Sequence, residues 1–315
     1  MQPLRSRLLL SFMGTDPNDS IMKKVILFLL SFVAVLALAV ILSPLIYPHL
    51  HFKFERIFNR IVMIGVLVCV AVFVRIRKET FAEYGLVWKK ESLRLLATAF
   101  MAPVLVLAGY VALQNVFEEA HFSFHDIGAG KWISRIILAT LTGLLIGSIE
   151  EFFFRGAVFH GCRRLWSSTV KGLFLSLFVT NVFYAIVHFV HAKRPFVDST
   201  PDFYDSLKLL AAPLASFSEF GQFWPGVVGL LIFGLMLNGL YLRTKSLYPA
   251  IGLHAGAVFF IKTDGLLVDF GTHNLLWGSG KMYDGIVGWF ALGFLYLVLI
   301  IFLKAPRVSG LGSQD

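Results

Sequence analysis

The chain has 315 residues, of which 57% are hydrophobic and only 15% are charged. Water-soluble globular domains average about 45–50% apolar and about 25% charged residues, so this composition excludes an ordinary soluble fold. A net charge of +9 would suggest nucleic-acid binding in a soluble protein. Here the Lys and Arg residues cluster at the ends of apolar runs, where they anchor helices at lipid surfaces. We therefore expect a lipid bilayer, and no nucleic acid, as the partner of these charges.

Apolar runs long enough to cross a hydrocarbon core, about 20 residues each, recur along nearly the whole chain. They predict an all-α polytopic membrane protein of about eight transmembrane helices with a central intramembrane polar cavity. The expected spans cover residues 25–47, 61–74, 95–116, 132–165, 172–191, 224–242, 247–261 and 286–303. The fourth run is longer than the bilayer core is thick, so it must tilt, kink or protrude.

The remaining segments complete the predicted organisation. Residues 81–94 contain Trp88-Lys89-Lys90 and are expected to form an interfacial amphipathic helix, and residues 207–214 suggest an interfacial or re-entrant stretch. We expect one transmembrane domain over residues 23–305, an N-terminal segment 1–22 that is disordered, and a C-terminal tail from 306 to 315. The Lys and Arg bias favours an integral protein of the cell (inner) membrane with both termini in the cytoplasm.

Two cysteines, Cys69 and Cys162, lie within or beside apolar segments and far apart in the sequence. A disulfide framework or a thiolate metal cluster needs more cysteines than this. We interpret both as ordinary buried thiols.

The fourth run carries three ionisable residues in its apolar interior: Glu150, Glu151 and Arg155. Each charge of this kind costs about 2.5–3.5 kcal/mol at the centre of a membrane helix, so it must face protein or an aqueous cavity. Glu151 and Arg155 have the i, i+4 spacing of a same-face ion pair, whereas Glu150 points about 100° away. One carboxylate is therefore predicted to be structural and the other free for chemistry, although an ion network that only locks helix packing has the same pattern.

Three histidines fall in later apolar helices: His188, His191 and His254. Two histidines on different helices, with an unpaired glutamate on a third, make a set able to bind Zn²⁺ or polarise a water molecule. His191 lies one turn after His188, as a supporting partner or at the helix end. Counting about 1.5 Å per residue from the inner helix ends puts His254 at about 12 Å, Glu150 at about 20 Å and His188 at about 24 Å depth. The helices must tilt if the three side chains are to meet.

The motif Glu150-Glu151 followed by Arg155 resembles the E-E-x-x-x-R motif of the CAAX-protease and bacteriocin-processing (CPBP, or Abi) family. Tyr184 to His188 resembles the family's F-x-x-x-H motif, and residues 234–255 resemble its later helix hairpin, which ends on His254. The resemblance covers about residues 143–258, within a CPBP-like core of about 130–262.

Two positions depart from the family's pattern. Tyr184 stands in place of Phe and adds a hydroxyl group, and the final H-x-x-x-N position is Val258. A polar group expected near the reacting atoms is therefore missing, and Asn238 on the preceding helix is a candidate substitute.

The resemblance implies an intramembrane metal-dependent endopeptidase that acts on a peptide or protein substrate at the membrane. It implies Glu150 as the general base that activates water, His188 and His254 as ligands of Zn²⁺ together with Glu150, and Glu151 with Arg155 as a brace. Two alternatives remain open. One is a non-catalytic relative, such as a self-immunity or scaffold protein, which Val258 favours. The other is an ion-coupled transporter with the glutamates as a relay, although the inverted repeats typical of transporters are not evident.

Overall fold

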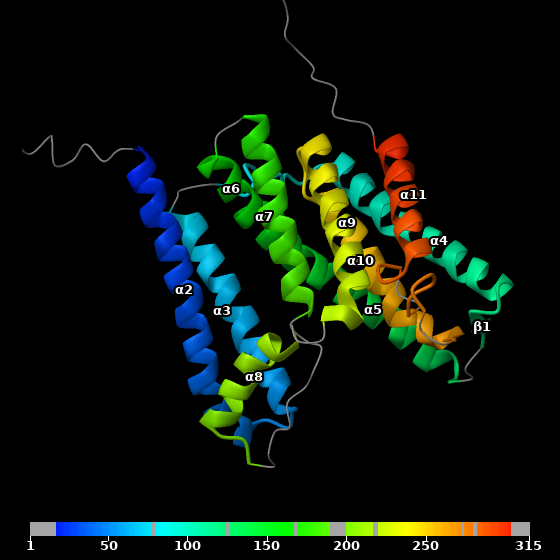
Figure 1. Cartoon of the computed structure of the whole chain (residues 1–315), viewed down its shortest axis with the longest axis horizontal. Coiled ribbons are helices and arrows are strands. Elements are labelled where there is room, and N and C mark those ends of the chain that lie inside the picture. Colours follow the sequence, from blue (N-terminus) through cyan, green and yellow to red (C-terminus); the bar gives the residue numbers. More distant parts are fainter. Residues whose placement is uncertain are drawn as a thin grey trace, which may run out of the picture.

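The computed structural model describes residues 17–76, 80–123, 127–166, 169–189, 200–216, 220–271, 274–279 and 282–303. Over these residues the protein is a bundle of helices with one small two-stranded sheet (Figure 1). The α-helices are α2 (Pro17–Ile46), α3 (Phe54–Ile76), α4 (Lys90–Val116), α5 (Ala129–Glu151), α6 (His160–Leu165), α7 (Val170–Phe189), α8 (Phe203–Ser216), α9 (Phe220–Thr244), α10 (Tyr248–Thr263) and α11 (Ile286–Phe302). The π-helical segment η2 (Phe152–Phe159) joins α5 to α6, and short 3₁₀ turns η1 (Tyr47–His49) and η4 (Asp264–Leu266) follow α2 and α10.

The predicted all-α membrane fold is confirmed. Each of the eight expected spans corresponds to a helix, and five helices among the described residues are long and apolar enough to cross a membrane: Leu30–His49, Lys90–Val116, Ala129–Leu165, Val170–His188 and Phe223–Thr244. Helix α11 is apolar but shorter. Their outward side chains are large and hydrophobic, with Leu105, Leu138 and Phe178 each more than 60% exposed. Apolar surface of this extent requires lipid around it, so the chain is an integral membrane protein.

The structure corrects the expectations for two segments. Residues 17–22 are helical and belong to α2. Residues 1–16 and the tail lie outside the described residues. Residues 81–94 do not form an amphipathic helix: a turn over 81–85 ends at Gly85 in a left-handed conformation (φ +78°), and α4 begins only at Lys90.

Helix α10 lies at the centre of the bundle, packed against both α4 and α5. Glycines permit this close approach, as in small-xxx-small helix pairs in membranes. A Cβ on Gly143 of α5 would lie 2.5 Å from the Ala255 carbonyl oxygen of α10. On the opposite face of α10, Gly252 and Gly256 meet backbone carbonyls of α4 in the same way. These contacts bury nearly every residue from Tyr248 to Ala257, so polar groups on α10 face protein rather than lipid.

The other elements surround this centre. Helices α2 and α3 form an antiparallel pair beside the core, with α8 packed on α2 at one end (Figure 1). Residues 207–214 are therefore part of α8, which is helical as far as the structure describes it. Strands β1 (Ala120–Phe122) and β2 (Val268–Phe270) pair antiparallel and tie α4 to the segment after α10.

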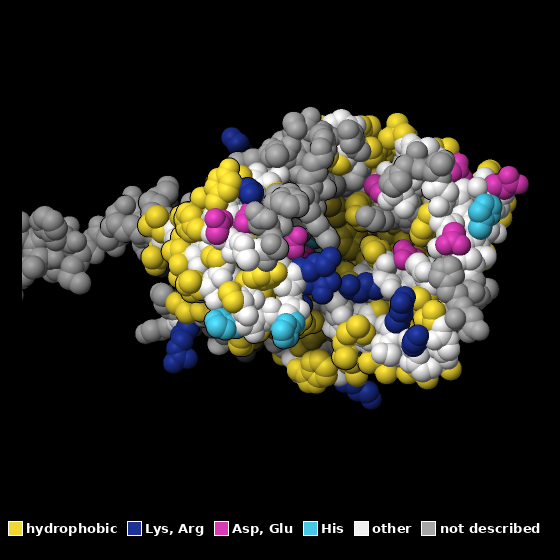
Figure 2. All heavy atoms as spheres, turned by 90° about the horizontal axis from the view of Figure 1, so that it is seen from below, with side chains coloured by type: hydrophobic (Ala, Val, Ile, Leu, Met, Phe, Trp, Pro, Cys, Tyr) yellow, Lys and Arg dark blue, Asp and Glu magenta, His cyan; other side chains and the backbone are white. Residues whose placement is uncertain are grey.

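The start of α2 and the end of α11 lie at the same end of the bundle (Figure 1). The opposite end, seen from below in Figure 2, carries acidic, basic and histidine side chains around a central hollow with a hydrophobic wall. Charges at an end and apolar side chains around the girth are the surface pattern of a membrane-spanning bundle.

Candidate active site

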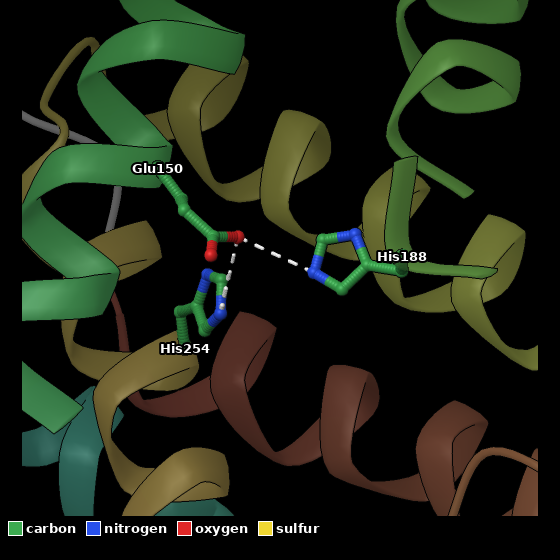
Figure 3. Close-up of side chains that lie close together, drawn as sticks. All are labelled: Glu150, His188 and His254. Carbon is green, nitrogen blue, oxygen red and sulfur yellow. Dashed lines mark ion pairs between the residues drawn. The ribbon is translucent and has the colours of Figure 1, made fainter. Parts of the chain in front are cut away.

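Three side chains from three helices converge in the core: Glu150 from α5, His188 from α7 and His254 from α10 (Figure 3). One ligand atom from each lies within 4.8 Å of the other two. The Oε2 atom of Glu150 is 3.3 Å from Nε2 of His188 and 3.8 Å from Nε2 of His254. These three residues were predicted from the sequence as a Glu-His-His set.

The change from α5 to the π-helical segment η2 comes directly after the two glutamates. Such π segments are rare and often lie at functional sites. The two carboxylates differ in their surroundings: the Glu151 side chain is fully buried, whereas 30% of the Glu150 side chain is exposed. The structure thus contains one buried and one partly exposed carboxylate, and their division into a structural group and one free for chemistry stays a prediction.

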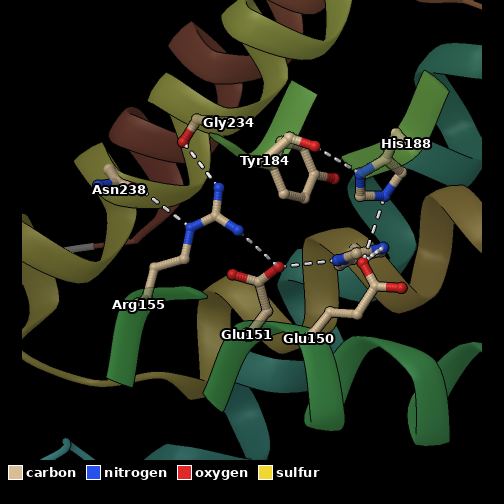
Figure 4. A network of polar contacts seen from close by, with 8 residues as sticks. Glu150, Glu151, Arg155, Tyr184, His188, Gly234 and Asn238 are labelled. Carbon is tan, nitrogen blue, oxygen red and sulfur yellow. Dashed lines mark hydrogen bonds and ion pairs between the residues drawn. The ribbon is translucent and has the colours of Figure 1, made fainter. Parts of the chain in front are cut away.

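Arg155 is the centre of a buried polar network (Figure 4). Its guanidinium group contacts Oε1 of Glu151 at 3.1 Å and donates to Oδ1 of Asn238 at 2.9 Å and to the carbonyl oxygen of Gly234 at 3.0 Å. The predicted Glu151–Arg155 ion pair is confirmed. Because Asn238 and Gly234 belong to α9, the network joins η2 to α9 and holds Glu151 in a defined position.

The hydrogen bonds of the two histidines determine which ring nitrogen carries the proton. Nδ1 of His188 lies 2.8 Å from the carbonyl oxygen of Tyr184, and a carbonyl oxygen can only accept. Nδ1 of His254 lies 2.7 Å from Oε1 of Glu151, the carboxylate oxygen that also pairs with the guanidinium group of Arg155 at 3.1 Å. Both Nδ1 atoms are therefore donors, and in the neutral rings both Nε2 atoms present lone pairs to Glu150.

With both rings neutral, three acceptor atoms face one another. Repulsion between their lone pairs disfavours this arrangement unless a proton or a metal ion is shared among them. Oε2 of Glu150 is buried and has no hydrogen-bond donor among the described residues. Two imidazoles and one carboxylate are a ligand set that suits Zn²⁺, and the Nδ1 partners are those that orient metal-binding histidines. The residues present thus fit a divalent metal ion.

A cavity of about 290 Å³ opens beside these side chains. Its polar wall is formed by Glu150, His188, His254, Tyr184 and Tyr283. The apolar wall consists of Leu107, Ile146, Leu230, Phe233, Ala257, Val258, Phe260, Ile261, Met282 and Leu292. A mostly apolar pocket with a few convergent polar groups is the usual form of a binding site.

The other residues considered from the sequence lie elsewhere. Asn238 is fully buried against Arg155 and is not among the cavity-lining residues described, so it does not replace the polar group missing at Val258. His160 packs against Tyr84 with ring centroids 5.3 Å apart, and His191 lies outside the described residues. Cys69 and Cys162 are free thiols; Cys162 is buried, as predicted, whereas Cys69 is only partly buried. Sequence reasoning missed Tyr283 and Met282, because they come from a loop with no motif or periodicity.

Residues 132–260 match the model of the type II CAAX prenyl endopeptidase Rce1-like family. The central segment of this chain is Rce1-like. The match spans α5 to α10 and includes all three converging side chains, and it confirms the resemblance to the CPBP family. Comparison with curated proteins gave no match, and comparison with solved structures gave none either. The similarity to membrane endopeptidases thus rests on the Rce1-like segment.

Proposed function

We propose that this protein is an intramembrane metal-dependent endopeptidase that hydrolyses a peptide bond within or beside the bilayer. The observation that carries the proposal is the convergence of Glu150, His188 and His254, whose three ligand atoms lie within 4.8 Å of one another, on the wall of an apolar cavity. The Rce1-like segment that supplies all three residues supports a protease rather than another membrane enzyme.

The proposed ion is Zn²⁺, held by Nε2 of His188, Nε2 of His254 and the carboxylate of Glu150. Such an ion, when bound, polarises a carbonyl group and lowers the pKa of a water molecule. The remaining chemistry belongs to the protein's own groups. Glu150 is the partly exposed carboxylate of the set and is the proposed general base, taking a proton from the attacking water and passing it to the departing amine. Its proximity to both histidines supports this role.

Glu151 and Arg155 are proposed to act through His254 rather than on the substrate. Glu151 accepts the Nδ1 proton of His254, and Arg155 holds the carboxylate of Glu151. This chain of contacts keeps the Nε2 lone pair of His254 directed at the cavity. A positioning role of this kind agrees with the complete burial of both Glu151 and Arg155.

The proposed substrate is a peptide or protein segment with apolar neighbours of the cleaved bond. The cavity offers it Leu107, Phe233 and Leu292, and the lining residues that the structure describes include no Lys or Arg. CAAX prenyl endopeptidases act on prenylated proteins, and a lipid-bearing substrate would suit such a wall. The proposed location is the cell (inner) membrane, and the Lys and Arg bias of the loops supports an orientation with both termini in the cytoplasm.

The alternative is a non-catalytic relative that keeps the cavity. The observation in its favour is Val258, which lies on the cavity wall where the family's motif has a polar residue. A relative of this kind would bind a ligand or metal ion without cleaving peptides.

Metal content is the first measurement. The protein would be purified in detergent without chelator, and zinc measured by elemental analysis in wild type, His188→Ala and His254→Ala. We expect near-stoichiometric zinc in wild type and its loss in both variants, whereas His160→Ala, which alters a histidine outside the site, should keep it. Wild type without zinc, nickel, cobalt or manganese after loading and dialysis would overturn the metal-dependent version.

A second measurement separates the enzyme from a non-catalytic relative. Zinc-loaded wild type and Glu150→Gln would be incubated with a prenylated CAAX peptide and with a mixture of unmodified peptides, and products followed by mass spectrometry. Cleavage by wild type alone is the expected result. Stoichiometric zinc without cleavage of any peptide would favour the non-catalytic alternative.

A further inference from the structure

The cavity wall offers few groups that can donate a hydrogen bond to a substrate. Apart from the proposed metal-binding residues, the described cavity-lining side chains are apolar except for two hydroxyl groups, those of Tyr184 and Tyr283. Position 258, one turn after His254 on α10, carries Val and has no polar atom in its side chain. Any hydrogen bond from this wall to a bound carbonyl oxygen must therefore come from a tyrosine or from a histidine.

Tyr184 is held rigidly beside the site. It is 1% exposed, and its ring packs edge-on against Phe154 with centroids 5.0 Å apart. The guanidinium carbon of Arg155 lies 4.7 Å from the ring centroid, and the ring of His188 lies 4.2 Å away. The same residue also accepts the Nδ1 hydrogen bond of His188 through its carbonyl oxygen. Contacts on several sides fix this ring without using its hydroxyl group.

The hydroxyl group of Tyr184 is directed toward the side on which His188 and Glu150 lie (Figure 4). In the part of the chain that the structure describes, this hydroxyl group makes no hydrogen bond, and Tyr184 is one of the residues that line the cavity. The hydroxyl group is therefore available to a ligand bound there. A buried ring whose polar tip alone reaches a cavity is suited to binding a polar atom of a ligand.

Peptide hydrolysis develops negative charge on the carbonyl oxygen as water adds to the carbonyl carbon. A fixed donor aimed at that oxygen stabilises the transition state more than the ground state. We infer that the Tyr184 hydroxyl donates this hydrogen bond, in place of a polar side chain at position 258. The inference rests on the proposed function, and it makes Tyr184 a catalytic residue that the family motif, with Phe at this position, does not contain.

Tyr283 carries the second hydroxyl group on the cavity wall and is compared with Tyr184. It lies on the loop before α11, is half-buried, and its carbonyl oxygen accepts from Nε1 of Trp289 at 3.1 Å. Burial, with a smaller contribution from Asp284, raises the pKa of Tyr283 to about 12, so its hydroxyl is also protonated at neutral pH. Unlike Tyr184, it comes from a loop rather than from the helix that carries His188.

The test uses the full-length zinc-loaded protein, a prenylated CAAX peptide and a phosphinate analogue of that peptide as a mimic of the tetrahedral transition state. Tyr184→Phe removes one oxygen and keeps the ring. We expect kcat to fall by about 10²- to 10³-fold, the effect of losing one oxyanion donor, with KM changed by less than about threefold. Phosphinate affinity should fall in parallel with kcat, whereas zinc content should not change.

Three further variants keep the result interpretable. Tyr204→Phe, which alters an exposed tyrosine of α8 outside the cavity-lining residues, should change kcat by less than about threefold, and Tyr283→Phe should lose less activity than Tyr184→Phe. Val258→Asn added to Tyr184→Phe should recover at least about tenfold of the lost kcat, since it supplies an amide donor from α10 at the same wall. If Tyr184 only supported the structure, Val258→Asn would not restore the kcat that Tyr184→Phe loses.

The outcomes separate this inference from the proposed function. Wild type that cleaves the peptide while Tyr184→Phe cleaves it equally well would overturn the role of Tyr184 and leave the protease intact. A loss confined to Tyr283→Phe would overturn it in the same way. Wild type that neither cleaves the peptide nor binds the phosphinate would overturn both. If Tyr184→Phe does not fold, the single variant Val258→Asn is measured instead. An affinity for the phosphinate no higher than that of wild type would count against an oxyanion position at this wall.

Discussion

Nδ1 of His254 lies 2.7 Å from Oε1 of Glu151, the same oxygen atom that Arg155 contacts at 3.1 Å. One carboxylate thus connects a cation on η2 to a ring on α10, and both of its neighbours are buried. The consequence is a fixed tautomer of His254, whose other nitrogen faces Glu150. The second glutamate of the motif is not among the described cavity-lining residues, and it contacts the ring that faces the first glutamate.

Breaking the Glu151–Arg155 pair is expected to destabilise the fold. Glu151→Gln leaves the Arg155 charge buried without its partner, which costs about 3–5 kcal/mol in other proteins. Thermal unfolding in detergent would show a lower midpoint than wild type. Arg164→Gln is the control, because Arg164 and Glu83 lie 4.0 Å apart and are about half exposed, and such pairs contribute about 0–1 kcal/mol. Equal midpoints for both variants would contradict the structural role of Glu151.

Glu150→Gln is expected to abolish cleavage while the protein stays folded. The side chain is partly exposed to the cavity, so its neutral isostere removes proton transfer and costs little in packing; losing a general base lowers kcat by about 10²- to 10⁴-fold. Peptide cleavage and the unfolding midpoint would be measured together.

The control for this variant is Ser148→Ala, two residues earlier on the exposed side of α5, which should cleave like wild type. The zinc content of Glu150→Gln separates two roles of Glu150. If zinc is retained while activity is lost, Glu150 is the general base; if zinc is lost, Glu150 is an essential zinc ligand. Cleavage at the wild-type rate would show that Glu150 is neither.

Zinc is expected to stabilise the protein through the three converging residues. A ligand that binds only the folded state adds about 2.7 kcal/mol when its free concentration is 100 times its dissociation constant. The unfolding midpoint of wild type should therefore rise on titration with zinc and return on chelation. His188→Ala should not respond, because it lacks one of the three ligands. A zinc-dependent rise of equal size in His188→Ala would place the ion elsewhere.

Side chains added at the α4–α10 contact are expected to disrupt the bundle. A Cβ on Gly256 would meet the carbonyl oxygen of Phe100 and the ring of Pro103. Overpacking of this kind costs about 1–3 kcal/mol or more, so Gly256→Ala should lower the unfolding midpoint and the yield of zinc-loaded protein. Gly109→Ala on α4, where a Cβ meets nothing within 4 Å, is the matched control and should be neutral or slightly stabilising. Identical behaviour of the two variants would argue against close packing of α10.

The motif residues were predictable because membrane burial makes charge conspicuous. Glu150, Glu151 and Arg155 stand out in an apolar run, and helical spacing alone predicts that Arg155 pairs with Glu151 rather than with Glu150. His188 and His254 stand out for the same reason. The class of fold followed from hydrophobic length, since only helices and closed barrels satisfy their backbone groups in lipid.

Other features could not be derived from spacing. Depth counted along straight helices separates His254 from His188, yet their Nε2 atoms both approach Glu150, because helix tilt and the π-helical segment are decided by packing against neighbours. The turn at 81–85 replaced an expected amphipathic helix for a similar reason: Gly85 approaches the backbone of Lys245 and Ser246, a contact between distant segments.

What the sequence by itself determined is therefore the membrane-spanning class, the Glu-His-His set and the ion pair, all of which depend on hydrophobicity and on spacing within single helices. Only the tertiary structure decided that Asn238 serves Arg155, that Val258 leaves the cavity wall apolar, and that Tyr184 and Tyr283 face the same space. These are relations between elements far apart in the chain. Their geometry is set by which glycines let helices approach and by which side chains fill the space between them.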